Sequence, residues 1–165
     1  MTATVPDPQR DRLYSWEAKW RSWNRKTDSL SDCRKYVHTA CAYYGIPPPS
    51  VRSHGGRAYS WSQADGNYAQ INTVRANGKS RSVISFNRDR GLNIPTALHE
   101  AAHAIASVLL PWEMADHDPR FVGIYLWLLI KTRIAPRSAL EASLTAAGLT
   151  WDSKTTPRSL KKKPA

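Results

Sequence analysis

The chain contains little cysteine and no long apolar run. Only two of its 165 residues are cysteines, Cys33 and Cys41, and they lie eight positions apart on one predicted helix. That separation is about 12 Å along the helix axis, which is too far for a disulfide, so we expect two buried thiols. The longest apolar run, residues 121–130, is shorter than the about 20 residues that span a bilayer. Residues 1–11 also lack the apolar segment of a signal peptide, so we expect a cytoplasmic protein without a membrane span.

Acidic residues are also scarce. The chain has 13 Asp and Glu against 24 Lys and Arg, which gives a formal charge of +11. Such a charge favours a polyanionic partner, with DNA or RNA ahead of an anionic membrane, whereas the alternative is a basic protein with a well-solvated surface. The candidate phosphate-binding side chains lie near both ends of the chain: Arg21, Arg25, Lys26, Lys161, Lys162 and Lys163.

The length and composition predict one folded domain. The hydrophobic fraction is 41%, and seven Trp and seven Tyr argue against a disordered chain. Residues 1–10 contain two prolines and no periodicity, so they are predicted to form a flexible arm. Residues 11–152 form the domain, and residues 153–165 are predicted to be a flexible basic tail.

The apolar periodicity predicts an α+β domain with N-terminal helices, a small sheet, and a central helix followed by C-terminal helices. In the middle third, Asp65-Gly66 and Asn77-Gly78 are two-residue hairpin signals that separate three short runs. These runs predict a three-stranded antiparallel sheet over residues 57–62, 67–75 and 79–87. Helices are predicted at residues 11–25, 31–44, 95–110, 121–132 and 138–147, with Ser31 as one N-cap, Gly45 as a stop, and Asp118-Pro119 as a helix start.

The predicted central helix carries the sequence His99-Glu100-Ala101-Ala102-His103. Residues four apart project from one helix face, so two imidazoles can bind one metal ion while the glutamate stands beside it. With the five histidines and four glutamates of this chain, a chance match is expected about four times in a thousand, so chance is a poor explanation. The pattern predicts one zinc ion per chain, bound by His99 and His103, with Glu100 as general base.

The surroundings of Glu100 favour this interpretation. It is the only acidic residue between positions 94 and 110, among Ala, Leu, Ile and Val. A carboxylate on so apolar a helix is costly to bury without a partner, and a metal site supplies one. The alternative is a helix whose polar side chains are satisfied by ordinary hydrogen bonds.

A catalytic zinc ion needs a third protein ligand. His117 lies fourteen residues after His103, just before a predicted helix start, and we favour it as the third ligand. His38 and His54 are expected to be ordinary histidines. The alternatives to His117 are nearby carboxylates: Glu113, Asp116 and Asp118.

Two other zinc-protease patterns do not match. The extended pattern needs Gly and His three and six residues after the second histidine, where this chain has Ala106 and Leu109. The pattern with a glutamate ligand on the next helix is disfavoured, because no glutamate occurs between positions 115 and 140.

The remaining pattern, His99-Glu100-x-x-His103 followed by His117-Asp118-Pro119-Arg120-Phe121, resembles the SprT-like metalloproteases. The resemblance covers about residues 79–130, and the downstream Cys-x-x-Cys zinc ribbon of some members is missing. It implies a small zincin-like, minigluzincin-like metallopeptidase domain, with protein or peptide substrates that include proteins crosslinked to DNA. The chain also resembles small metallohydrolases of actinobacteria and their phages.

A peptidase needs a substrate rail and an oxyanion donor. Residues 81–87, a strand that leads into the central helix, are the candidate rail, because an extended peptide pairs with a sheet edge. Tyr125 is the candidate oxyanion donor, and its alternative role is a core tyrosine. Two rival functions stay open: a nucleic-acid-binding protein in which zinc is structural, and a zinc hydrolase that acts on small amides.

Overall fold

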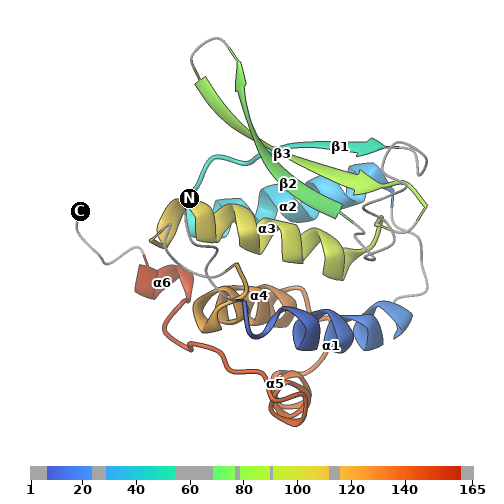
Figure 1. Ribbon diagram of the computed structural model, residues 1–165, viewed down its shortest axis with the longest axis vertical. Helices are drawn as coiled ribbons and strands as arrows, with labels where there is room; N and C mark the ends of the chain where they lie inside the picture. The colour runs from blue at the N-terminus through green and yellow to red at the C-terminus, as the bar shows by residue number, and fades with distance from the viewer. Residues whose placement is uncertain are drawn as a thin grey trace.

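The structure is a computed structural model that describes residues 7–23, 29–54, 69–76, 79–89, 91–111 and 116–160. It has the α+β composition that the sequence predicts, with six helices and three strands among these residues (Figure 1). In chain order the elements are α1 (Arg10–Trp23), α2 (Leu30–Tyr44), β1 (Ser50–His54), β2 (Ala69–Ala76), β3 (Lys79–Asn87), α3 (Ile94–Leu109), α4 (Pro119–Lys131), α5 (Arg137–Ala146) and α6 (Pro157–Leu160).

Helix α3 occupies the middle of the molecule. The sheet and α2 lie on one side of it, and α1 and α4 lie on the other, with α5 beyond them (Figure 1). All residues of α3 from Pro95 to Ala102 are buried. A helix that is covered on both sides must be apolar nearly all round, which explains why α3 has only a few polar positions.

The N-terminus of α2 corrects one prediction. Ser29, not Ser31, is the N-cap: its Oγ accepts from the backbone N–H of Asp32 at 3.1 Å, and the Asp32 carboxylate accepts from the backbone N–H of Ser29 at 3.2 Å. This reciprocal pair satisfies two backbone donors, which a cap at Ser31 would not do. The predicted stop at Gly45 is confirmed, with a left-handed φ of 69°.

The two helices that flank the candidate site begin at side-chain caps. Asn93 Oδ1 accepts from the backbone N–H of Thr96 at 2.9 Å at the start of α3. The predicted start at Asp118-Pro119 is confirmed, because Asp118 Oδ1 accepts from the N–H groups of Arg120 and Phe121 at 2.8 and 3.0 Å. One cap fixes the start of α3, the helix that carries two of the candidate histidines. The other fixes the start of α4, which directly follows the third.

The prediction of a three-stranded antiparallel sheet is wrong. The strand order is β1-β3-β2; β2 is antiparallel to β3, but β1 is parallel to it, so the sheet is mixed. The predicted first strand, residues 57–62, lies outside the described residues, and β1 comes earlier, at Ser50–His54. A parallel neighbour needs no tight turn, so hairpin signals could not locate it.

The central position of β3 also excludes the predicted substrate rail. Residues 81–87 belong to β3, whose backbone pairs with β1 on one side and β2 on the other. A strand with both edges paired cannot add a peptide strand. The edges of the described sheet are β1 and β2, and β2 contacts α3.

Aromatic and apolar side chains of α1 and α2 form much of the core. Leu13, Trp16 and Trp20 of α1 are 0%, 2% and 5% exposed, so their side chains pack into the core. Cys33 and Cys41 are buried free thiols, as predicted. No helix in the described part of the chain is both long and apolar enough to cross a membrane.

The two predicted flexible ends are described only in part. Residues 1–6 and 161–165 lie outside the described residues. The end of the predicted arm is packed on the domain, since Gln9 is 4% exposed, and Thr155 in the predicted tail is 2% exposed. The described part of the predicted arm lies near the candidate site, and the described part of the predicted tail lies near α4.

Candidate metal centre

Helix α3 presents His99 and His103 on the face that meets α1 and α4. Because they are one turn apart, their rings stand next to each other, with Nε2 atoms 3.0 Å apart. His99 is 4% exposed, and His103 is half-buried. The helix geometry alone therefore supplies two imidazole nitrogens at one point.

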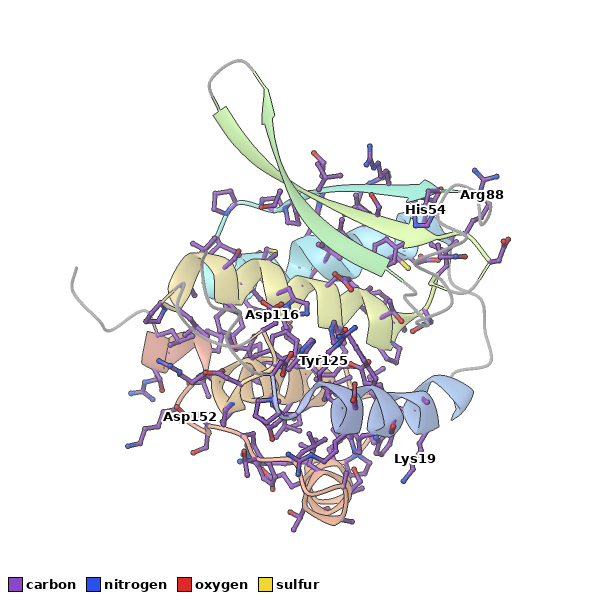
Figure 2. All side chains as sticks on the ribbon, in the orientation of Figure 1. Lys19, His54, Arg88, Asp116, Tyr125 and Asp152 are labelled. Atoms are coloured by element: carbon purple, nitrogen blue, oxygen red, sulfur yellow. The ribbon has the colours of Figure 1, made fainter. Side chains whose placement is uncertain are left out.

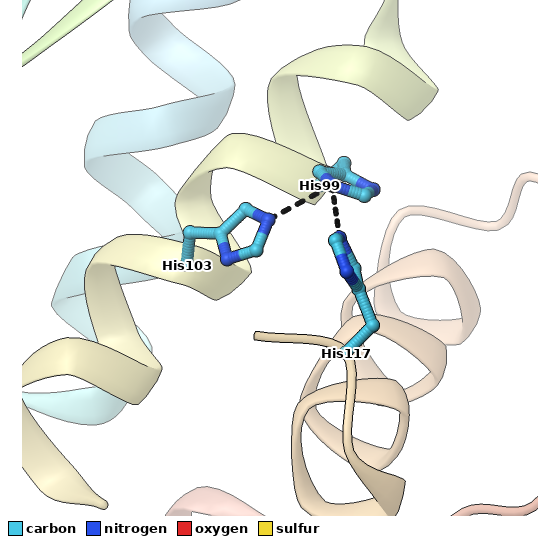
Figure 3. Close-up of side chains that lie close together, drawn as sticks. All are labelled: His99, His103 and His117. Atoms are coloured by element: carbon cyan, nitrogen blue, oxygen red, sulfur yellow. Dashed lines mark hydrogen bonds between the residues drawn. The ribbon is translucent and has the colours of Figure 1, made fainter. Parts of the chain in front are cut away.

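His117 reaches the same point from the residue before the α4 N-cap. Its Nε2 lies 3.3 Å from Nε2 of His99, and its side chain is buried. The Gln9 amide donates to the backbone carbonyl of His117 at 3.1 Å and so holds its main chain in place. Figure 3 shows the three rings directed toward one another from α3 and from the start of α4.

The separations suit a metal ion with tetrahedral geometry. Zinc–nitrogen bonds of about 2.0–2.1 Å at tetrahedral angles place ligand nitrogens about 3.3 Å apart. The Nε2 atom of His99 lies 3.0 Å from that of His103 and 3.3 Å from that of His117, and one ligand atom from each of the three histidines lies within 4.8 Å of the others. No fourth His, Cys, Asp or Glu among the described residues joins this group. The described residues therefore fit a three-histidine metal centre.

Carboxylates hold the opposite nitrogens of two of the rings. Nδ1 of His99 donates to Glu17 of α1, and Nδ1 of His117 donates to Asp7 Oδ2 at 2.5 Å. A carboxylate only accepts hydrogen bonds, so Nδ1 carries the proton, and in the neutral ring Nε2 then keeps its lone pair. In metal sites, carboxylates that accept from the ring nitrogen away from the metal orient the histidine ligands in the same way.

The environment of the rings favours neutral imidazoles. Burial lowers the pKa of His103 well below its usual value, and the neighbouring His99 and His117 lower it further. Burial and His99 also lower the pKa of His117, although Asp7 opposes this shift. Neutral imidazole is the form that binds a metal ion.

Glu100 lies between the two histidines of α3 in sequence and is 6% exposed. Burial raises the pKa of its carboxyl to about 7; the proximity of His99 lowers this pKa, and the charge of Glu17 raises it. A carboxyl with such a pKa exchanges protons near neutral pH, which is what a general acid–base group requires.

Tyr125 occupies a core position. It is 1% exposed, its hydroxyl donates to the Pro95 carbonyl at 3.2 Å, and its ring lies 5.5 Å from that of His99 (Figure 2). The hydroxyl proton is therefore engaged by the backbone of α3. The Tyr125 ring packs against His99 from the α4 side. The Phe121 ring does the same, with its centroid 5.2 Å from that of His99.

Neither of the described alternatives for the third ligand, Asp116 and Asp118, joins the histidine group. Asp116 is exposed, Asp118 caps α4, and Glu113 lies outside the described residues. Of the two remaining histidines, His38 lies on α2, and His54 lies at the end of the sheet, away from the centre (Figure 2).

The candidate phosphate-binding residues cannot be placed. Arg21 belongs to α1, but its side chain is outside the described part of the chain, and so are Arg25, Lys26, Lys161, Lys162 and Lys163. Nucleic-acid binding through these residues stays a prediction.

Sequence reasoning missed Glu17 and Asp7. Glu17 lies in the apolar stripe of α1 beside Leu13, Trp16 and Trp20, and it is 2% exposed. A carboxylate in an apolar stripe was the signal that favoured Glu100, and the same signal marks Glu17. Asp7 has no such signal, because it precedes the first helix.

Comparisons with known proteins identify no family for this chain. No family model, curated protein or solved structure matches the chain.

Proposed function

We propose that the protein is a zinc-dependent hydrolase in which His99, His103 and His117 bind the metal ion and Glu100 is the general base. The observation that carries the proposal is the convergence of three Nε2 atoms, two of them held in the metal-binding tautomer by Glu17 and Asp7. Structural zinc sites have four protein ligands, whereas catalytic sites have three and leave one position open. The described residues offer three.

The proposed reaction is hydrolysis of an amide or peptide bond. The metal ion, when bound, supplies Lewis acidity that polarises a carbonyl and makes a water molecule more acidic. The Glu100 carboxylate accepts a proton from water as the new C–O bond forms, and returns it to the leaving nitrogen as the C–N bond breaks. The burial of Glu100 limits the access of bulk water to this proton transfer.

Peptides are the first substrate class to test, as in the SprT-like metalloproteases. Small amides are the second class, because His99 and His117 are almost completely buried.

A non-catalytic role of the metal ion is the second candidate function. The burial of His99 and His117 between three helices favours a zinc ion that joins α3 to the start of α4 in a basic nucleic-acid-binding protein. In that case Glu100 has no role in chemistry.

The variant Glu100→Gln separates the two candidates. It keeps the size and shape of the side chain but removes the base. We expect it to retain zinc and to lose at least about 100-fold in turnover of peptide or small-amide substrates, measured by mass spectrometry of the products. Glu141→Gln, a half-buried carboxylate on α5, is the matched control and should retain full activity. Equal activity of Glu100→Gln and the wild type would contradict the proposal.

A further inference from the structure

The segment Asp7–Glu17, called here the N-terminal segment, contacts two of the three histidines although it lies far from them in sequence. Glu17 is 82 residues before His99, and Asp7 is 110 residues before His117. Neither residue belongs to the His99–His103 motif. These contacts depend on how α1 docks against α3 and α4.

Each carboxylate accepts a hydrogen bond from Nδ1 of its histidine, the ring nitrogen that faces away from the converging Nε2 atoms. The Glu17 and His99 side chains are 3% and 5% exposed, so this hydrogen bond is shielded from water. The Asp7 and His117 side chains are 18% and 4% exposed. A shielded carboxylate–imidazole hydrogen bond fixes the ring orientation and makes Nε2 a stronger donor to a metal ion.

Two neutral side chains of the N-terminal segment add to these contacts. The Gln9 amide donates to the carbonyl of His117, while its carbonyl accepts from the backbone N–H of Thr150 at 2.7 Å. The Tyr14 ring stacks on His99 with centroids 5.7 Å apart, and it meets His117 edge-on at 5.3 Å. The segment thus touches His99 and His117 through a ring and hydrogen bonds.

We propose that the N-terminal segment is part of the metal centre, with Glu17 and Asp7 as positioning residues, so that metal binding and docking of α1 strengthen each other. The inference rests on the proposed metal site but not on the proposed hydrolysis. Thermodynamic linkage requires the coupling to act in both directions: the docked segment raises metal affinity, and the metal ion stabilises the docked segment.

The first test measures zinc affinity by competition with a chromophoric chelator. We expect Glu17→Gln and Asp7→Asn to bind Zn²⁺ about 10-fold more weakly than the wild type, and Glu17→Ala about 100-fold more weakly. Partial rescue by Gln follows because its carbonyl still accepts from Nδ1. Asp11→Asn removes the same charge from an exposed position of α1 and should leave the affinity unchanged.

The absorption spectrum of the Co²⁺-substituted protein provides a readout that a purely structural role would not move. The visible bands report ligand geometry, so Glu17→Gln and Asp7→Asn should shift them, whereas Asp11→Asn should not. Circular dichroism of each metal-free variant checks its fold. If Glu17→Ala fails to fold, Asp7→Asn provides the same test, because Asp7 lies outside the helices.

The second test measures the reverse coupling by amide hydrogen exchange. Saturating Zn²⁺ should slow exchange in α1 of the wild type at least about 10-fold. In Glu17→Ala the slowing in α1 should be lost.

The outcomes separate this inference from the proposed function. Wild-type zinc binding with equal affinity in Glu17→Gln, Asp7→Asn and Asp11→Asn would overturn the inference and leave the hydrolase proposal standing. Weakened binding in the two site variants, together with full activity of Glu100→Gln, would support the inference and overturn the hydrolase proposal. A wild-type protein that binds no zinc would overturn both.

Discussion

The Nε2 atoms of His99 and His103 lie 3.0 Å apart, and the Nδ1 proton of His99 is held by Glu17. In its neutral form His99 therefore directs a lone pair, not a proton, toward its neighbours. Nitrogen lone pairs at this separation repel one another unless a proton or a metal ion lies between them. Burial disfavours the protonated form of His103, which is consistent with the proposed metal ion at this point.

The first prediction concerns metal content. Purified wild-type protein should contain about one zinc ion per chain by mass spectrometry of the metal, whereas His103→Ala and His117→Ala should contain almost none. His38→Ala is the control, because His38 lies on α2 outside the cluster. Full zinc content in His117→Ala would refute the three-histidine centre.

The second prediction concerns stability. A ligand that binds only the folded state stabilises it by about 2.7 kcal/mol when its free concentration is 100 times Kd. Zinc at that excess should raise the midpoint of thermal unfolding of the metal-free wild type by several degrees, as measured by circular dichroism. His117→Ala should show no such rise at the same zinc concentration. A similar rise in this variant would mean that the metal binds elsewhere.

The local part of the centre could be predicted from the sequence because it depends on helix geometry. His99 and His103 share a face of α3 whatever the rest of the chain does. Asp118-Pro119 fixes the start of α4, and His117 precedes it. Glu17 and Asp7 could not be assigned, since their contacts depend on how α1 packs against helices that follow it by more than 70 residues.

The sheet shows the same division between local and long-range information. The β2–β3 pair extends to Ala76 and Lys79, as a two-residue connection at Asn77-Gly78 requires, although those two residues lie outside the described part of the chain. The parallel pairing of β1 with β3 leaves no turn signature in the sequence. For that reason the order of the strands, and with it the central position of β3, could not be derived.

The third prediction concerns alkaline pH and Cys41. Burial raises the pKa of its thiol from 9.0 to about 12. Above pH 9 the unfolded chain releases this proton while the folded chain keeps it, so the free energy of unfolding falls. The contribution of the protonated Cys41 thiol to the free energy of unfolding is fully present below pH 9. It is lost as the pH rises toward 12, by about 1.4 kcal/mol per pH unit.

Urea unfolding at pH 8, 9, 10 and 11 measures this loss. Cys41→Ala removes the group, so its free energy of unfolding should fall less steeply above pH 9 than that of the wild type. Only the difference between the two slopes is compared, because the substitution also removes packing in the core. Parallel slopes would show that the Cys41 thiol titrates normally in the folded protein.

The fourth prediction concerns Gly123, which packs α4 against the backbone of the segment before α6. A Cβ atom at this position would lie 2.1 Å from the Asp152 carbonyl oxygen and 2.3 Å from Thr155 Oγ1. That segment is held in place, because the Asp152 N–H donates to the Pro119 carbonyl at 2.7 Å and the Tyr44 hydroxyl donates to the Thr155 carbonyl at 2.8 Å. The backbone must shift to admit a methyl group.

We therefore expect Gly123→Ala to destabilise the protein by about 1–3 kcal/mol in urea unfolding. Helix propensity alone predicts the opposite sign, a stabilisation of about 1 kcal/mol. Ala142→Gly, at an exposed position of α5, measures the propensity effect without a steric clash and should destabilise by about 1 kcal/mol. A more stable Gly123→Ala variant would show that the segment after α5 is free to move away from α4.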